Sequence, residues 1–276
     1  MPSHVNSCPV VKTRPFAPLS FSLRIATSNM MTNFAFAPIA FIETPFKEKF
    51  GTPRQPSLVP SSWGVIRLKN ELNLNGAFEG LEGFSHAWLV FVFHQNENKA
   101  VRAKIHPPRM DGEKTGLFST RTPHRPNPIG LSAVKIEKIE GNTLYVSGVD
   151  LVDGTPILDI KPYLPSSDRI DGATAGWTSN KAERRLTVEF DEKALRDLAE
   201  RVGDESRDRF RAAIREMLEL DPRPVFYKGT PENPNPYTDL YGFRLADLNV
   251  VYRMVDTVAT VVEIQSWSAY MAGKGM

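Results

Sequence analysis

The chain has 276 residues, of which 41% are hydrophobic and 24% charged, and its formal net charge is +2. This composition is typical of globular proteins with one large domain or two smaller ones, and no apolar run approaches the roughly 20 residues that cross a bilayer. The single cysteine, Cys8, excludes an internal disulfide and a cysteine-ligated metal cluster, and it favours a cytoplasmic location.

Residues 1–31 form a leader that is rich in Pro and Ser and has three basic residues but no acidic ones. Three interpretations stay open: a translated upstream extension with its natural start at Met30 or Met31, a disordered tail, or a targeting peptide. The first two are favoured, and the leader is left out of the predicted fold. Without its three cations the chain carries 31 basic against 32 acidic residues, so net charge does not indicate a nucleic-acid-binding protein.

From Phe34 onwards the pattern predicts many short β-strands, over residues 34–42, 63–68, 84–94, 129–139, 143–149 and 156–160. Both faces of segment 84–94 are largely apolar, as in a strand that is covered on both sides. Pro38 favours an edge or a bend, and Gly141-Asn142 is typical of a hairpin turn. A mainly β fold is therefore predicted, a small barrel or sandwich. A Rossmann fold is disfavoured because no Gly-x-Gly-x-x-Gly opens a helix.

The predicted organisation is a barrel domain over residues 32–165, a polar linker over 166–182 and a small α+β domain over 183–270. In this last domain the pattern predicts a strand at 185–190, helices at 191–202 and 204–220, and strands at 243–254 and 257–267. Apolar stripes at helical spacing support both helices. Asp221-Pro-Arg-Pro224 ends the second one, because proline cannot continue a helix.

Positive charge is concentrated between residues 99 and 125. The stretch contains Lys99, Arg102, Lys104, Arg109, Lys114, Arg121 and Arg125, with His106 and His124, against Asp111 and Glu113. A loop-rich basic stretch of this kind can bind phosphate. A solvated charged surface explains it equally well.

Two proline-stiffened loops carry polar side chains that suit a binding site. Residues 119–132 hold three prolines within six positions and present Arg121, His124, Arg125 and Asn127. A loop that is already ordered loses little entropy when it binds a ligand. Residues 52–57 present Arg54, which suits a carboxylate. The alternatives are a barrel corner whose arginines cap carbonyl groups and an ordinary surface loop.

Segment 150–163 adds the carboxylates Asp150, Asp153 and Asp159, which suit the hydroxyls of a ribose. The alternatives are a turn at Asp153 and an ion pair between Asp159 and Lys161. No metal is expected, because His86 and His94 would lie about 26 Å apart on a straight strand. A serine hydrolase is not expected either, because the sequence contains no Gly-x-Ser-x-Gly motif.

Five motifs, in this order, together resemble the TrmO (YaeB/TsaA-like) family. They are Pro53-Arg-Gln-Pro, Leu81-Glu-Gly-Phe-Ser-His-Ala-Trp, Phe93-His-Gln, Thr120-Arg-Thr-Pro-His-Arg-Pro-Asn-Pro-Ile-Gly130 and Asp150-Leu-Val-Asp-Gly-Thr-Pro-Ile-Leu-Asp-Ile-Lys-Pro-Tyr163. The similarity runs from about residue 34 to 267 and includes Asp221-Pro-Arg-Pro224 and Tyr227-Lys-Gly of the bacterial members. The leader and segment 181–185 have no counterpart, and Ala87 stands where a larger apolar residue is expected.

This resemblance implies a homodimeric β-barrel enzyme that transfers methyl from S-adenosylmethionine to N6 of threonylcarbamoyladenosine, next to the tRNA anticodon, with the cofactor near the subunit interface. It implies cofactor contacts at Arg54, Gln55, Pro56, Ser57, His94, Gln95, Arg121, Leu131, Asp153, Gly154, Thr155 and Pro156. The tRNA contacts expected are Arg125, Asn127, Asp221 and Arg223.

Methyl transfer from a sulfonium is a one-step displacement, so alignment is needed more than a nucleophile. The carbonyl group on N6 makes its proton more acidic, so a weak base suffices. Asp159 or Tyr163 is predicted to take or orient that proton. Two other functions stay open: a methyltransferase of the same barrel acting on another RNA or a small molecule, and a non-catalytic RNA-binding module.

Overall fold

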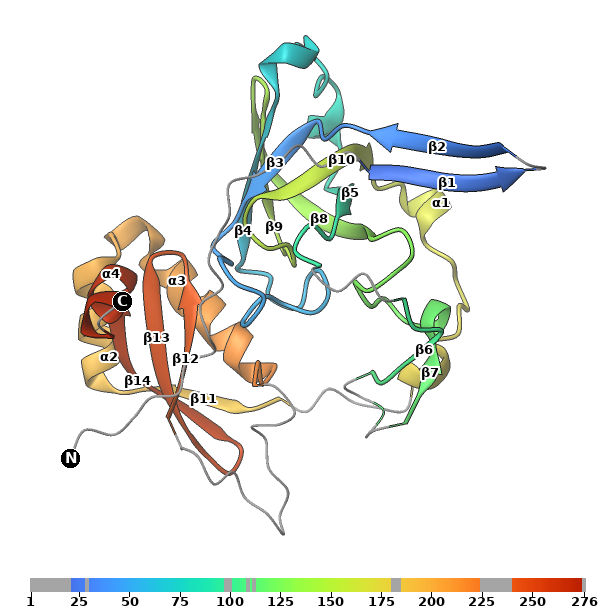
Figure 1. Ribbon diagram of the computed structural model, residues 1–276. Helices are drawn as coiled ribbons and strands as arrows, with labels where there is room; N and C mark the ends of the chain where they lie inside the picture. The colour runs from blue at the N-terminus through green and yellow to red at the C-terminus, as the bar shows by residue number, and fades with distance from the viewer. Residues whose placement is uncertain are drawn as a thin grey trace.

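The computed structural model describes residues 21–27, 30–96, 101–107, 110, 113–179, 185–223 and 240–274, with only the backbone described before residue 34. Lys99, Arg109 and Asp111 of the basic stretch, and Pro224 and Tyr227-Lys-Gly of the matched motifs, lie outside these residues. The described chain comprises a closed barrel and a mixed α+β unit beside it (Figure 1).

The predicted barrel is confirmed. Its six strands close in the order β10-β3-β4-β9-β8-β5, and all neighbours are antiparallel. Their bounds are β3 (Ala40–Glu43), β4 (Trp63–Leu68), β5 (His86–Val92), β8 (Ile129–Glu140), β9 (Thr143–Ser147) and β10 (Thr155–Pro162). Because the strands alternate in direction, the chain leaves β3, β5 and β9 and enters β4, β8 and β10 at one end of the barrel, which we call the loop end. Loops 44–62 and 148–154 and the described ends of segment 93–128 meet the barrel there.

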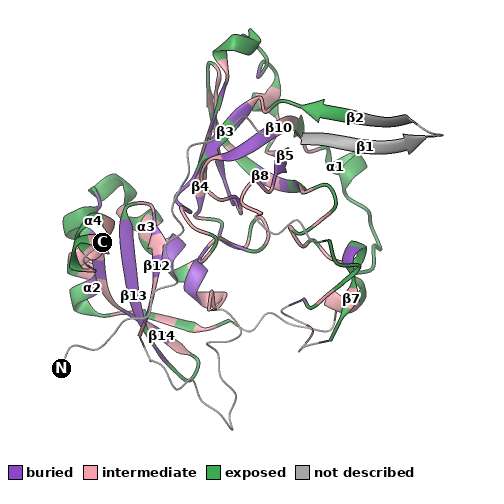
Figure 2. Ribbon diagram, viewed as in Figure 1, coloured by how far each residue is buried: buried purple, intermediate pink, exposed green. Residues whose placement is uncertain are grey.

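The barrel interior is filled by apolar side chains that alternate along each strand. Ile42, Ile66, Leu89 and Ile157 are fully buried, and Figure 2 shows the buried residues on the barrel strands. At Gly130 a β-carbon would lie 2.3 Å from the ring of the buried Phe91. The start of β8 therefore requires glycine, since this ring occupies the space of any larger residue.

Several segments differ from the prediction. The leader contributes β1 (Phe21–Thr27), which pairs with β2 (Met30–Phe36) in a separate hairpin. The predicted strand 34–42 is divided between β2 and β3, with Pro38 in the bend. β6 (Lys104–Ile105) and β7 (Thr115–Gly116) form another small hairpin. Within the predicted linker, Trp177 donates a hydrogen bond to the Ser119 carbonyl (2.9 Å), which fixes the linker beside the basic stretch.

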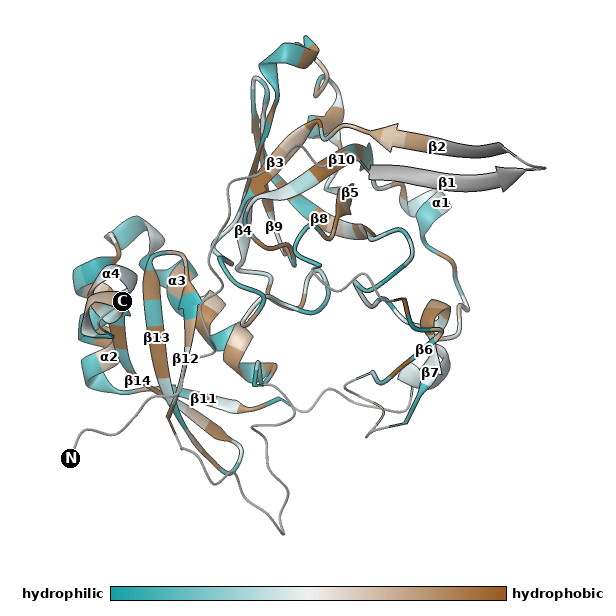
Figure 3. Ribbon diagram, viewed as in Figure 1, coloured by the Kyte–Doolittle hydropathy of each residue, from teal (hydrophilic) through white to brown (hydrophobic). Residues whose placement is uncertain are grey.

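The α+β unit is a four-stranded sheet in the order β11-β14-β13-β12, in which only β11 runs parallel to its neighbour. Its elements are β11 (Thr187–Phe190), α2 (Glu192–Arg201), α3 (Asp204–Glu219), β12 (Leu240–Leu245), β13 (Leu248–Val255), β14 (Val258–Ser266) and α4 (Trp267–Gly273). Figure 3 shows a largely hydrophilic α2 and hydrophobic residues along β13.

Both predicted helices are confirmed, but the prediction of one strand over 243–254 is wrong. Ala246 adopts φ 52°, so the chain turns there and β12 and β13 form a hairpin. The sequence gives no turn signal at this position, because alanine rarely adopts a left-handed backbone. Helix α4 was also not predicted; it begins at Trp267 because the Ser266 hydroxyl accepts the Ala269 amide (3.2 Å).

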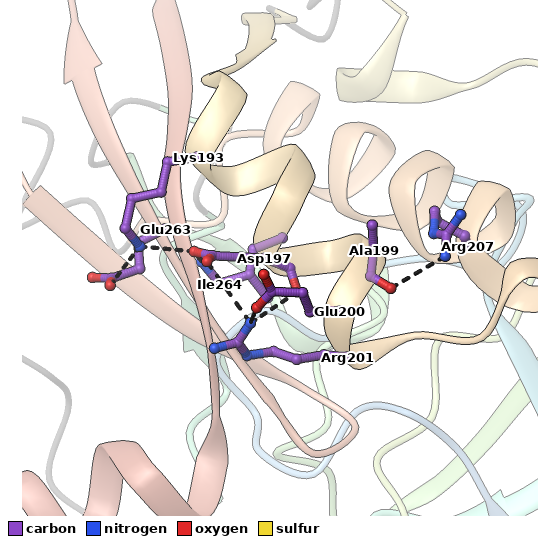
Figure 4. Close-up of polar contacts among 8 residues, drawn as sticks. All are labelled: Lys193, Asp197, Ala199, Glu200, Arg201, Arg207, Glu263 and Ile264. Carbon is purple, nitrogen blue, oxygen red and sulfur yellow. Dashed lines mark hydrogen bonds and ion pairs between the residues drawn. The ribbon is translucent and has the colours of Figure 1, made fainter.

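A mostly buried carboxylate joins α2 to the sheet (Figure 4). Asp197 accepts hydrogen bonds from the Ile264 amide (3.0 Å) and the Lys193 ammonium (2.8 Å), and Lys193 also reaches Glu263 (2.7 Å). Burial alone would raise the pKa of Asp197, but Lys193 and the Ile264 amide outweigh it and lower that pKa. The ionised carboxylate therefore holds the helix against β14.

We expect Asp197→Ala to lower the free energy of unfolding by about 1–3 kcal/mol, because the Ile264 amide loses its acceptor. Since the folded pKa is lowered, this stabilisation is present above the unfolded pKa of about 4 and disappears as the pH falls through the folded value. Urea unfolding at pH 7 and pH 3 measures it. Glu200→Ala, which removes an exposed carboxylate from the same helix, is the control. Equal losses at both pH values would contradict the assignment.

The two units share one continuous core at the loop end of the barrel. The Glu216 carboxylate of α3 accepts hydrogen bonds from the amide (2.9 Å) and the hydroxyl (2.8 Å) of Ser61. Trp63, the first residue of β4, packs against Phe210 of α3 with ring centroids 4.8 Å apart. Loop 44–62 is therefore held between the barrel and α3.

Candidate functional site

Loops 44–62 and 148–154 are joined by hydrogen bonds at the loop end. The Ser57 amide donates to the Gly148 carbonyl (2.9 Å), and the hydroxyls of Thr44 and Ser62 donate to the Leu151 (3.0 Å) and Val149 (3.1 Å) carbonyls. These contacts fix the segment that presents Arg54 to Ser57 against the segment that leads into β10.

Asp153 also joins these two loops. Its carboxylate accepts the Thr44 amide (2.8 Å) and pairs with the Lys47 ammonium (2.9 Å). Gly154 follows with φ 73°, which completes a turn into β10 and makes its amide available to the Ile42 carbonyl (2.8 Å). The turn that was the alternative for Asp153 is therefore present, and it places Thr155 and Pro156 at the loop end.

The long loop 93–128 is tied to loop 44–62 by side chains. The Arg121 guanidinium donates to the Gln55 side-chain oxygen (3.0 Å), although the two residues are 66 positions apart. The Lys49 ammonium donates to the Gln95 carbonyl (2.5 Å), and the Asn96 amide reaches the Pro123 carbonyl (2.6 Å). Three of the predicted cofactor residues, Gln55, Gln95 and Arg121, thus take part in the contacts that join these two segments.

His94 lies two residues after the end of β5, at the same end. Burial lowers the pKa of His94, and the Lys49 ammonium adds to this, while the Val92 carbonyl and Asp153 act in the opposite direction. The imidazole is therefore neutral at pH 7, with one donor and one acceptor nitrogen. A neutral ring suits hydrogen bonding to a nucleoside better than it suits ion pairing.

Asp150, at the loop end, was predicted only as a carboxylate that suits ribose hydroxyls, and it was not among the predicted site residues. Its carboxylate accepts the hydroxyl of Ser132, a buried residue of β8, at 2.7 Å. Burial raises the pKa of Asp150 to about 6, although Ser132 and the Arg121 guanidinium lower it. A carboxyl group whose pKa approaches the working pH, beside other candidate residues, is characteristic of functional sites. The signal in the sequence was its position in the Asp150-Leu-Val-Asp motif.

A cleft of about 220 Å³ opens between loop 44–62 and the end of α3. It is lined on one side by residues 49–54, 58 and 59, and on the other by Met217, Leu220 and Pro222. Arg54 therefore faces the junction of the two units. The apolar wall on the α3 side shows that the second unit helps to shape the surroundings of the site.

The remaining predicted residues are not all brought to the loop end. Leu131 and Asp159 lie on the outer face of the barrel, where both are opposite Val90 on adjacent strands. Asp159 forms the ion pair with Lys161 (2.7 Å) that was the alternative to a binding role. Tyr163 follows β10 at the opposite end, about 26 Å along the strand from Thr155. Its ring lies 5.6 Å from that of Trp88.

The four residues predicted to contact tRNA lie in two different parts of the structure. The Arg125 guanidinium donates to the Thr120 carbonyl (2.9 Å), which fits the carbonyl-capping alternative, and Asn127 is exposed. Asp221 and Arg223 form a mostly buried ion pair (2.8 Å) after α3. The proposed proton-handling and tRNA-binding roles stay predictions.

Within the described ranges, no three His, Cys, Asp or Glu side chains are arranged to hold a metal ion. In the same part of the chain, no helix has the length and apolar character required to span a membrane. The candidate site therefore consists of arginines, amides, carboxylates and one neutral histidine at the end of a β-barrel.

Residues 41–169 match the family model of the tRNA-methyltransferase O N-terminal domain, and residues 183–267 match that of the TrmO C-terminal domain. The chain is 39% identical over 234 residues to the tRNA (adenine(37)-N6)-methyltransferase of Escherichia coli K12, covering 82% of this chain and 95% of that protein. The chain belongs to the TrmO family.

A second relative and a solved structure support this assignment to the family. A putative S-adenosylmethionine-dependent methyltransferase, RcsF, of Pseudomonas aeruginosa is 42% identical over 215 residues, which are 78% of this chain and 90% of that protein. The crystal structure of TrmO from Pseudomonas aeruginosa superposes with a TM-score of 0.67 at 36% identity, covering 84% of this chain and 99% of that one. The barrel and the α+β unit are therefore both parts of the TrmO fold.

Proposed function

We propose that this chain methylates N6 of adenosine 37 in tRNA with S-adenosylmethionine as the methyl donor, and that its substrate nucleoside carries the threonylcarbamoyl group. The observation that carries the proposal is the contact between Arg121 and Gln55, which joins two proline-braced loops at the loop end. The names of the relatives from Escherichia coli and Pseudomonas aeruginosa support the reaction and the cofactor. The single cysteine and a tRNA substrate support a cytoplasmic location.

The residues at the loop end fit the cofactor chemically. The guanidinium groups of Arg54 and Arg121 suit its carboxylate, and the neutral His94 and the amide of Gln95 suit the hydroxyls and ring nitrogens of its nucleoside. When bound, S-adenosylmethionine supplies an electrophilic methyl group on a sulfonium. The protein must hold the acceptor nitrogen in line with that methyl, and rigid loops serve this alignment.

The N6 nitrogen must lose its proton as the new bond forms. Asp150 is the carboxylate at the loop end that best suits this transfer, because its raised pKa brings it close to neutral pH while leaving it mainly ionised. The Ser132 hydroxyl holds the carboxylate in one orientation. Asp159 and Tyr163, which the sequence analysis predicted for this proton, lie on the outer face and at the opposite end.

We propose further that two copies assemble through the outer face of β5 and β8. Leu131 and Ile129 are 54% and 39% exposed there, and a partner would remove these apolar side chains from water. The same face carries Asp159 opposite Val90, so a second copy would cover this carboxylate as well. Light scattering after size exclusion measures the mass, and a monomer at micromolar concentration would contradict the dimer.

The test of the activity is mass spectrometry of nucleosides from tRNA incubated with the protein and S-adenosylmethionine. Parallel reactions contain tRNA with and without the threonylcarbamoyl group. A gain of one methyl on the modified nucleoside alone supports the proposal. Methylation of another RNA only would favour a different substrate, and binding of RNA without any transfer would favour a non-catalytic module.

A further inference from the structure

Phe118 is the most exposed of the large hydrophobic side chains in the described part of the chain, at 79%. It lies in the short turn η3 (Leu117–Ser119), directly before the proline-braced loop at 120–128. An isolated exposed apolar residue needs no explanation in itself. The surroundings of this one, however, set it apart.

The turn that carries Phe118 is firmly held. Leu117 beside it is buried, and the Leu117 amide donates to the Ala103 carbonyl (2.9 Å). The Ser119 carbonyl accepts the indole of Trp177 (2.9 Å), and the Thr120 hydroxyl donates to the Leu117 carbonyl (2.8 Å). The ring is therefore presented to solvent by a fixed backbone, so little entropy is lost when a flat partner stacks on it.

This ring belongs to a segment that is rich in exposed cations. The Arg125 guanidinium lies 5.5 Å from the ring centroid of Phe118. Exposed cations at positions 102, 104, 114 and 121 belong to the same segment, in which Glu113 is the acidic residue that the structure describes. An exposed aromatic ring among positive charges is the combination that binds single-stranded nucleic acid, through base stacking and phosphate contacts.

Phe118 also lies near the candidate site. It lies three positions before Arg121, whose guanidinium contacts Gln55 at the loop end, so the two α-carbons are at most about 11 Å apart. Stacked bases follow each other at about 3.4 Å along a strand. A base on Phe118 would therefore belong to a nucleotide within a few positions of the one at the loop end.

We propose that the Phe118 ring is a stacking platform for an unpaired base beside the target adenosine in the tRNA loop, with the neighbouring cations on the phosphates. This inference rests on the proposed function, because it takes tRNA as the partner. The positive charge of the segment favours RNA over a second copy of this chain as the occupant. Stacking and phosphate contacts do not depend on base identity, so the stacked base can be any of the four.

The experiment compares the wild type with Phe118→Ala, Phe118→Leu and Phe118→Trp. Fluorescence anisotropy gives the Kd for an anticodon stem-loop RNA at fixed salt, calorimetry gives the Kd for S-adenosylmethionine, and light scattering gives the mass. Phe41→Ala is the matched control, because Phe41 is 42% exposed and also lies beside a cation, Lys69 (4.9 Å).

We expect Phe118→Ala and Phe118→Leu to weaken RNA binding by about 5–150-fold, the range for loss of one stacked base. Cofactor affinity and mass should not change, and Phe41→Ala should behave as wild type. Phe118→Trp should bind as wild type, with its indole fluorescence quenched by the RNA.

Wild-type RNA affinity in both Phe118→Ala and Phe118→Leu would overturn the stacking role while leaving the methyltransferase proposal intact. A lower mass of Phe118→Ala than of wild type would also overturn it, in favour of a partner subunit on this ring. A wild-type protein that neither binds nor methylates tRNA would instead remove the proposed function itself.

Discussion

Asp150→Asn is expected to lower kcat for tRNA methylation by about 10²-fold, at the lower end of the effect of a general base. The substitution keeps the shape of the side chain and its acceptor for the Ser132 hydroxyl, but it removes the group that takes the proton. The wild-type rate should fall as the pH drops through about 6, and the residual rate of Asp150→Asn should be nearly independent of pH. Single-turnover methylation between pH 5 and 8 measures both profiles.

The same substitution should stabilise the protein at neutral pH. Burial raises the pKa of Asp150 to about 6 in the folded state, so the folded protein binds this proton more tightly than the unfolded chain does. Stability therefore decreases as the pH rises from about 4 to 6, and the cost of the buried charge is complete above 6. We expect the Tm of Asp150→Asn to exceed the wild-type value at pH 7.5 and to equal it near pH 4.

Asp159→Asn is the matched control, since it removes a carboxylate of the same segment that is exposed and paired with Lys161. It should leave the pH profile and the Tm almost unchanged, because exposed ion pairs contribute little. If Asp159→Asn abolishes the rate and Asp150→Asn does not, the proton acceptor is Asp159, and the site must include the outer face of the barrel.

Much of this fold could be predicted from local patterns, for reasons that individual segments make clear. The continuous apolar run 84–94 marks a strand covered on both sides, and β5 occupies its centre. Helix α3 follows from its apolar stripe and from the proline after Asp221. The hairpin at Ala246 could not be predicted, because its cause is a left-handed backbone at a residue that rarely adopts one.

The candidate site was predictable to the extent that its parts lie in recognisable motifs. Motif order identified the loops with Arg54, His94, Arg121 and Asp153, but sequence separation conceals which of them meet. The contact between Arg121 and Gln55 depends on barrel closure, which only the three-dimensional arrangement shows. The raised pKa of Asp150 likewise depends on burial against β8, and a sequence motif carries no information on burial.

Trp63→Ala is expected to have the largest effect on stability, about 3 kcal/mol in the free energy of unfolding, near the lower end for removing a large aromatic side chain. The Trp63 ring packs on Phe210 (4.8 Å) and beneath the Arg209 guanidinium (5.2 Å), so it joins β4 to α3. Its loss should also weaken cofactor binding, because loop 44–62 immediately precedes Trp63 and depends on α3 for one of its supports. Urea unfolding and calorimetric titration with S-adenosylmethionine measure the two effects.

Trp63→Phe retains an aromatic contact with Phe210 and should recover most of both losses, which separates the packing effect from a general intolerance of substitution at this position. Trp177→Ala serves as a second control, because the indole of Trp177 is bound to Ser119, away from the contact between the two units. The coupling between the α+β unit and the site holds only if stability and cofactor affinity fall together in Trp63→Ala. A destabilised protein with unchanged cofactor affinity would show that loop 44–62 keeps its shape through its contacts with segments 93–128 and 148–154, without support from α3.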